Sequence, residues 1–113
     1  MEDTLTGNVV TVTLEDGEDK EGKSCVVVDR VIARAGDTIR WETGDREVSI
    51  WFPESGVFFS PVLAIKHTGT VEATIPSGLA VTEEIVCEYC IYLHKTHEFV
   101  VGGSHPKLEI PWP

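Results

Sequence analysis

The chain concentrates soft metal ligands in one short segment. Residues 87–97, CEYCIYLHKTH, contain two thiols and two imidazoles, those of Cys87, Cys90, His94 and His97, at the end of an apolar run. Thiolate and imidazole are the ligands that copper and zinc prefer in proteins. The segment therefore predicts a metal site of the copper or zinc type.

The two thiols of this segment are not equivalent. In an extended strand successive side chains point to opposite faces, so Cys87 and Tyr89 would share one face while Glu88 and Cys90 share the other. We therefore predict that Cys87 is a core thiol and that Cys90 is the candidate ligand. The total of three cysteines is odd and too small for a disulfide framework, which leaves Cys25 as a spare thiol.

Two further histidines are candidates to complete a site around Cys90 and His94. His97 follows His94 by three residues, and His105 precedes Pro106, which favours extended backbone at His105. The alternative for both is a solvated histidine in a turn. His67, in IKHTGT, is expected at the surface.

The acidic composition limits the classes of partner. The 113 residues include 19 Asp and Glu but only nine Lys and Arg, for a formal net charge of −10. Nucleic acids and anionic membranes are bound through basic patches, so neither is an expected partner, and neutral or cationic partners are favoured. No apolar run approaches the roughly 18 residues that span a bilayer, so membrane insertion is not expected.

The N-terminal sequence MEDTLTGNVVTV has no basic region, apolar region or cleavage site typical of a signal peptide. A cytoplasmic protein is expected as the chain is written, and a periplasmic or extracellular one if a signal peptide was removed. Catalytic motifs such as Gly-x-Ser-x-Gly, the P-loop and His-Glu-x-x-His are absent from the sequence, so an enzyme is not expected.

Short apolar or β-branched runs between Gly, Pro, Asp and Ser predict strands along most of the chain. Segment 53–66 is left open between a short helix and a packed loop, 15–21 is expected to be a solvated hairpin, and the aromatic residues Trp51, Phe52, Phe58 and Phe59 are expected in the core. Without alternation of helices and strands, the pattern predicts one all-β domain over residues 1–113, a Greek-key β-sandwich. The predicted strands are 9–14, 25–33, 38–42, 47–52, 71–75, 84–92 and 107–110.

Two stretches of the sequence resemble the cupredoxins, a family of small β-sandwich copper proteins. Segment 33–53, ARAGDTIRWETGDREVSIWFP, is similar to the family's Gly-Asp-x-β-x-Trp strand followed by a strand that ends in an aromatic residue and proline. In EEIVCEYCIYLH, Cys90 and His94 stand where the family has a ligand cysteine followed by a ligand histidine. The segment GSHPKLEI supplies the closing strand, and the resemblance spans roughly residues 26–110.

The resemblance implies a cupredoxin-like fold with Cys90 and His94 as copper ligands and with His97 or His105 completing an atypical site. The family's upstream histidine falls at Val48, and no methionine stands at its axial position because the chain has only Met1.

Two classes of function follow from the resemblance. The first is atypical copper binding, with electron transfer or copper carriage toward a redox or metal-transfer protein partner, and with zinc as the alternative metal. The second is a metal-free module that kept the scaffold, lost the copper site and binds other molecules. The sequence does not indicate an oligomeric state.

Overall fold

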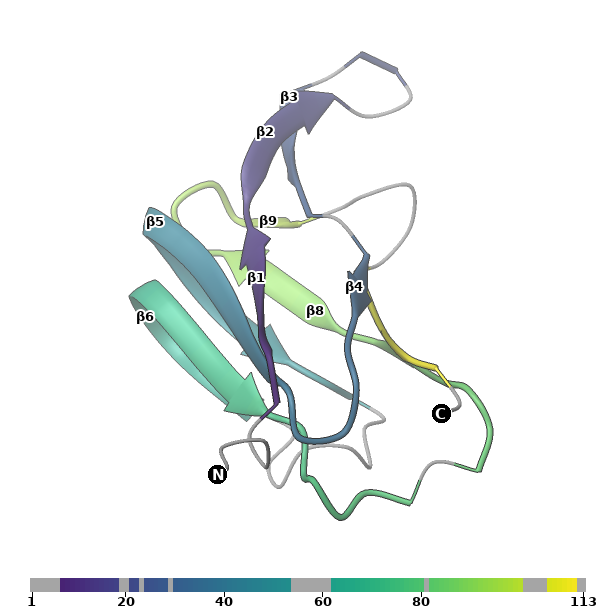
Figure 1. Ribbon diagram of the computed structural model, residues 1–113. Coiled ribbons are helices and arrows are strands. Elements are labelled where there is room, and N and C mark those ends of the chain that lie inside the picture. The colour runs from purple at the N-terminus through teal and green to yellow at the C-terminus, as the bar shows by residue number, and fades with distance from the viewer. Residues whose placement is uncertain are drawn as a thin grey trace.

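The computed structural model consists of β-strands and their connections. Two sheets enclose one core, and a two-stranded hairpin projects from one end (Figure 1). In the part of the chain that the structure describes, no helix is present, and so none that could cross a membrane. The predicted all-β class is confirmed. The structure describes residues 7–18, 21–22, 24–28, 30–53, 62–80, 82–100 and 106–111.

The larger sheet is built around the long strand β5 (Thr38–Trp51). One edge of β5 pairs antiparallel with β6 (Val62–Thr74). The other edge pairs in parallel with β1 (Val9–Thr13) and then, further along, antiparallel with β8 (Cys90–Leu93). Beyond β8 lies the short strand β9 (Glu98–Phe99). Strand β8 therefore lies inside the sheet, between β5 and β9.

The smaller sheet has β10 (Lys107–Ile110) at its centre. Residues 107–110 were predicted to form a strand, and this is confirmed. Strand β4 (Val31–Ile32) pairs with β10 in parallel, and β7 (Ile85–Glu88) pairs with it antiparallel. The projecting hairpin consists of β2 (Glu15–Glu18) and β3 (Ser24–Val27), whose acidic side chains are exposed, as expected for a solvated hairpin.

Two predicted strands are wrong in their extent, because each is divided between different sheets. Segment 25–33 contains β3 of the hairpin and β4 of the smaller sheet, and segment 84–92 contains β7 of the smaller sheet and β8 of the larger one. The alternation of side chains is the same whichever partner a strand pairs with, so periodicity predicted the buried face and not the change of sheet.

The predicted strands 38–42 and 47–52 are joined into the single strand β5. The pairing of β5 with β6 is irregular after Glu42, and the buried hydroxyl of Thr43 bridges the irregularity. It accepts a hydrogen bond from the Gly69 N–H at 2.9 Å and donates one to the Gly69 carbonyl at 3.0 Å. A side chain thus replaces part of the backbone ladder. Of the open segment 53–66, residues 54–61 lie outside the described part, and residues 62–66 begin β6.

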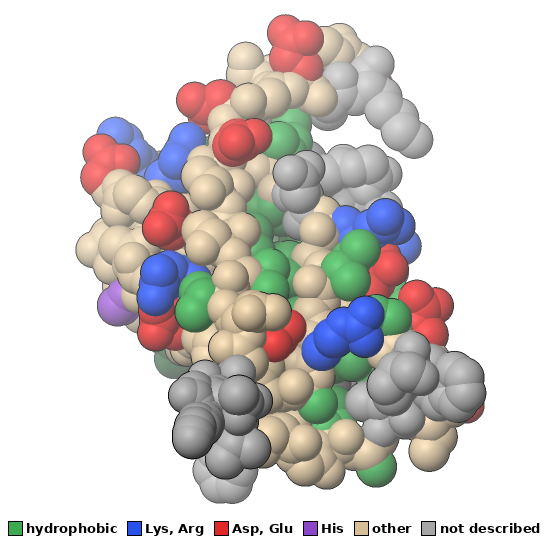
Figure 2. Space-filling model, viewed as in Figure 1, with side chains coloured by type: hydrophobic (Ala, Val, Ile, Leu, Met, Phe, Trp, Pro, Cys, Tyr) green, Lys and Arg blue, Asp and Glu red, His purple; other side chains and the backbone are tan. Residues whose placement is uncertain are grey.

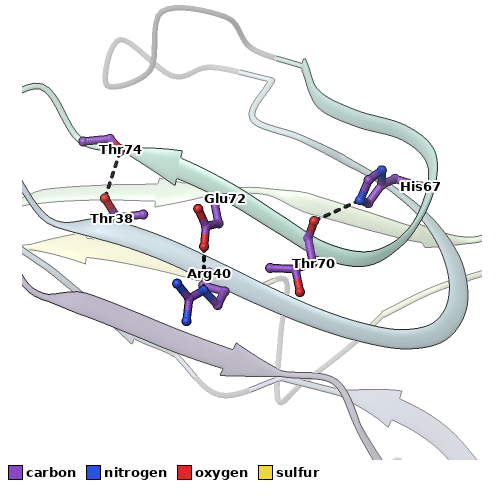
Figure 3. Close-up of polar contacts among 6 residues, drawn as sticks. All are labelled: Thr38, Arg40, His67, Thr70, Glu72 and Thr74. Atoms are coloured by element: carbon purple, nitrogen blue, oxygen red, sulfur yellow. Dashed lines mark hydrogen bonds and ion pairs between the residues drawn. The ribbon is translucent and has the colours of Figure 1, made fainter.

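Cross-strand side-chain pairs reinforce the register of β5 and β6 (Figure 3). The hydroxyls of Thr38 and Thr74 lie 2.9 Å apart, and Arg40 Nε lies 2.6 Å from Glu72 Oε2. The ion pair is solvent-exposed and is worth about 1 kcal/mol or less. His67 Nε2 lies 2.9 Å from the Thr70 carbonyl, and His67 is exposed, as predicted.

A buried carboxylate fixes the turn that leads into β5. Gly36 has a positive φ of 90°, which favours glycine, and its N–H donates to the Ile75 carbonyl at 2.8 Å. The next residue, Asp37, accepts hydrogen bonds from the backbone N–H groups of Asn8 and Arg34, both at 2.9 Å. One side chain therefore holds together the chain before β1 and the turn before β5.

The centre of the core is an aromatic group formed by Trp41, Phe52 and Tyr89, all fully buried. The Tyr89 ring stacks on Phe52 with centroids 4.7 Å apart, and the Trp41 indole N–H donates to the Tyr89 hydroxyl at 3.1 Å. Tyr89 lies between β7 and β8, where the chain passes from the smaller sheet to the larger one. Both sheets supply the surrounding core, which includes Val31, Ile39, Val48, Ile50, Ile91, Leu93, Leu108 and Ile110.

We predict that Tyr89→Phe lowers the free energy of unfolding by about 1–3 kcal/mol, because the buried Trp41 N–H loses its acceptor. Urea denaturation followed by circular dichroism measures this change. The matched control is Tyr92→Phe, which removes a hydroxyl from the outer face and should change stability less. Equal effects of the two substitutions would contradict the role given to the buried hydrogen bond.

Burial raises the pKa of Tyr89 from its ordinary value of 10 to about 12, and the hydrogen bond from Trp41 partly opposes this rise. Between pH 10 and pH 12 the unfolded chain releases this proton while the folded protein keeps it. We therefore predict that Tyr89 stabilises the fold fully below pH 10, and that this contribution falls by about 1.4 kcal/mol per pH unit above it. Denaturation midpoints of the wild type and Tyr89→Phe should converge over this range, and parallel curves would refute the prediction.

Candidate functional site

The candidate ligands lie on the outer face of the larger sheet. In β8 the side chains of Ile91 and Leu93 enter the core, so those of Cys90 and Tyr92 point outward and are half-buried. His94 follows β8 directly and continues the outward row. The three outward residues therefore lie one after another along a single strand face, with Tyr92 in the middle.

Cys90 lies opposite Trp51 of β5. Burial raises the pKa of the Cys90 thiol, and the negative charge of Glu88 raises it further. Both effects favour the neutral thiol over the thiolate that binds metals and attacks electrophiles.

His94 is held against β5 by two contacts. Its backbone N–H donates to the Glu47 carbonyl at 3.0 Å, which extends the strand pairing by one residue. Its Nε2 lies 2.7 Å from the hydroxyl oxygen of Ser49, a side chain of the same outer face. The His94 ring also meets the Tyr92 ring edge to face, with centroids 5.1 Å apart. The imidazole thus already has a polar partner.

His97 approaches the same tyrosine from the turn after β8. It has a positive φ of 58° and an exposed side chain, and its Nδ1 lies 3.3 Å from the Tyr92 hydroxyl. His94 and His97 therefore both contact Tyr92. His105, the fourth candidate ligand, lies outside the described residues.

Cys90 and His94 stand four residues apart in the outward row, with Tyr92 between them. Four residues of extended strand span about 13 Å, and the Tyr92 side chain stands between the two. Copper and zinc need each ligand atom within about 2.0–2.3 Å. No three His, Cys, Asp or Glu side chains among the described residues are grouped so that they could hold a metal ion.

The other positions compared with the copper site serve the core. Val48, where the family's upstream histidine falls, is fully buried and pairs with Leu93 of β8. Cys87 pairs with Leu108 in the smaller sheet and packs against the core, which confirms its prediction as a core thiol. Burial raises the pKa of Cys87. The two thiols of the cluster therefore belong to different sheets.

An aromatic group on the outer face was not predicted. Trp51 was expected in the core, but it is half-buried on the outer face, whereas Phe52 does lie in the core. Phe99 of β9 meets both Trp51 and Tyr92 edge to face, with centroids 6.0 and 5.1 Å away. The alternation of side chains along a strand could have predicted this position, because an inward Phe52 requires an outward Trp51 in an extended strand. Phe58 and Phe59 lie outside the described residues.

We call this surface the aromatic face. Phe99 is 53% exposed, and Val62, which pairs with Trp51 from β6, is 46% exposed. Cys90 and Val62 flank Trp51 on its two sides, so the apolar surface runs across four adjacent strands. Its members are Trp51, Val62, Cys90, Tyr92 and Phe99.

Two hollows lie elsewhere on the surface. The larger hollow has a volume of about 350 Å³ and is lined by Pro53, Val86, Cys87, Glu88 and Lys107. It is close to the aromatic face in the sequence, because Pro53 follows Trp51 by two residues and Glu88 precedes Cys90 by two. The smaller, of about 160 Å³, lies between β1 and β4, where Figure 2 shows hydrophobic side chains between the strands. Ligand pockets usually exceed about 300 Å³, so only the larger hollow has a suitable size.

We predict that Glu88→Gln speeds the alkylation of Cys90 by iodoacetamide at a fixed pH. Removing the negative charge lowers the pKa of Cys90 and increases the thiolate fraction. Peptide mass spectrometry measures the rate at Cys90 separately from the other two thiols. Glu84→Gln, at an exposed glutamate before β7, is the control and should leave the rate unchanged. A slower reaction in Glu88→Gln would contradict the assigned contact.

Comparison with models of known protein families gives no match for this chain, and no curated protein sequence matches it. Function is therefore inferred from the arrangement of residues. On the outer face that arrangement is an apolar, aromatic surface with two histidines at its border.

Proposed function

We propose that the chain is a metal-free, cupredoxin-like Greek-key β-sandwich that serves as an interaction module for another protein. The observation that carries the proposal is the outward row of Cys90, Tyr92 and His94. An aromatic side chain separates the two candidate copper ligands and joins them to an exposed apolar surface.

The scaffold part of the proposal is supported by the structural use of the family-like residues. Gly36 and Asp37 form the turn before β5, and Trp41 and Phe52 fill the centre of the core. These residues belong to the turn before β5 and to the core between the sheets. The resemblance to cupredoxins thus concerns residues that hold the fold.

The proposed loss of the copper site is supported by the surroundings of the residues at the family's ligand positions. Val48 is a core residue, so a ligand at that position would have to leave the core. The His94 Nε2 already has the Ser49 hydroxyl at 2.7 Å, and a metal would have to displace it. Cys90 keeps its proton more strongly than an ordinary thiol. Each of these features lowers the affinity expected for copper.

A role in binding is supported by the exposure of large apolar side chains. Phe99 and Val62 are about half exposed on the outer face of the larger sheet. Aromatic residues are enriched at protein interfaces, and contiguous exposed apolar patches mark such sites.

Copper titration tests this proposal. We expect the reduced protein to bind copper(I) and copper(II) no more tightly than Cys90→Ala or His94→Ala, and to show no intense thiolate-to-copper charge-transfer band. Cys25→Ala controls for copper held by a single thiol outside the candidate set. A tight one-to-one complex that is lost in both Cys90→Ala and His94→Ala would refute the metal-free function.

A further inference from the structure

We infer that the aromatic face, together with Glu88, is the docking site for a protein segment that presents a basic side chain among apolar ones. This inference rests on the proposed function and adds to it the surface and the chemistry of the partner. It is carried by the position of one carboxylate, that of Glu88, in the lining of the hollow that also includes Pro53, two residues after Trp51.

The apolar part of the site is preorganised. Trp51, Tyr92 and Phe99 hold one another by edge-to-face contacts, and Trp51 and Tyr92 are anchored on paired strands. Rings fixed in this way lose little conformational freedom when a partner covers them. Aromatic anchors of this type carry much of the binding energy in protein interfaces. The face is therefore suited to apolar side chains of a partner.

Glu88 adds a negative charge at the border of this face. It precedes Cys90 by two residues, on the strand that leads into β8, and its negative charge acts on the Cys90 thiol. It also lines the larger hollow, together with Pro53 and Val86. Val86 is 50% exposed, which extends the apolar surface into the hollow. The carboxylate thus lies at the hollow, near the exposed Val86 and across from Lys107, which lines the same hollow.

The Glu88 carboxylate is available to a partner. Glu88 is exposed and pairs through its backbone with Lys107 of β10, but no ion pair or hydrogen bond joins its side chain to another described residue. An arginine suits this position, because its guanidinium can pair with a carboxylate while its plane lies over an aromatic ring.

Overall charge also favours a basic partner over a second copy of the chain. Each chain carries a formal charge of −10, so two copies repel each other while a cationic segment is attracted. Attraction of this type speeds association and weakens as salt rises. The expected occupant is therefore a basic and apolar segment of a different protein.

Selection of random peptides displayed on phage against the full chain tests this inference. We expect the enriched peptides to carry Arg or Lys next to aromatic or aliphatic residues. Phe99→Ser should weaken their binding by about tenfold or more, as truncation of an aromatic anchor does. Glu88→Gln should weaken binding and reduce its dependence on salt. Fluorescence anisotropy with labelled peptides measures both effects.

The control is Ile32→Ser, which changes a 51% exposed residue of the smaller sheet and should leave binding unchanged. Circular dichroism and thermal melting verify that each variant is folded. Peptides that lack basic residues, or that bind Phe99→Ser and Glu88→Gln as tightly as the wild type, would overturn the inference. So would a dimer in sedimentation that Phe99→Ser dissociates, since the occupant would then be a second copy.

The copper titration and the peptide selection have distinguishable negative outcomes. Tight copper binding that requires Cys90 and His94 would remove the proposed function and with it the docking site. If copper does not bind in this way, and peptides bind Phe99→Ser and Glu88→Gln as tightly as the wild type, the proposed interaction module would stand. Only the docking site inferred for it would be overturned.

Discussion

The buried hydrogen bond between the Trp41 indole and the Tyr89 hydroxyl constrains the rest of the structure. A phenol in an apolar core needs a polar partner, and the indole N–H of Trp41 supplies one. Tyr89 lies where the chain leaves the smaller sheet for the larger one, so this bond ties the crossing between the sheets to β5 in the core. Once Tyr89 points inward, strand alternation directs Ile91 and Leu93 inward as well, and Cys90 and Tyr92 outward.

That constraint decides what the histidine and cysteine cluster can do. A metal site needs ligands that converge on one point, whereas side chains along one face of a strand are spread in a line. The short cysteine-to-histidine spacing suits a metal site when a turn follows the cysteine directly. Here β8 continues for three residues after Cys90, and the turn begins at His94. The same residues therefore form a surface, with the thiol and the imidazole as parts of its border.

Much of the fold could be predicted from local patterns. The all-β class, the strand 107–110, the solvated hairpin and the inward position of Cys87 all follow from alternation and turn residues, which act over a few neighbours. The division of segments 25–33 and 84–92 between sheets could not be predicted, because it depends on partners far away in the sequence. The candidate site was affected in the same way. The positions of the candidate ligands along one outer face depend on where β8 begins and ends, and Trp51 was assigned to the core by its type although its neighbours indicated the outer face.

The pairing of β4 with β10 has a consequence for how the chain folds. It joins a segment near residue 31 to one near residue 108, in parallel, and so closes a loop of most of the chain. Closing so long a loop loses conformational entropy before its contacts are gained, which slows folding. The ribbon of β5 and β6 joins neighbouring segments and can form earlier. The smaller sheet depends on this distant β4–β10 pairing, so we expect it to form after the β5–β6 ribbon.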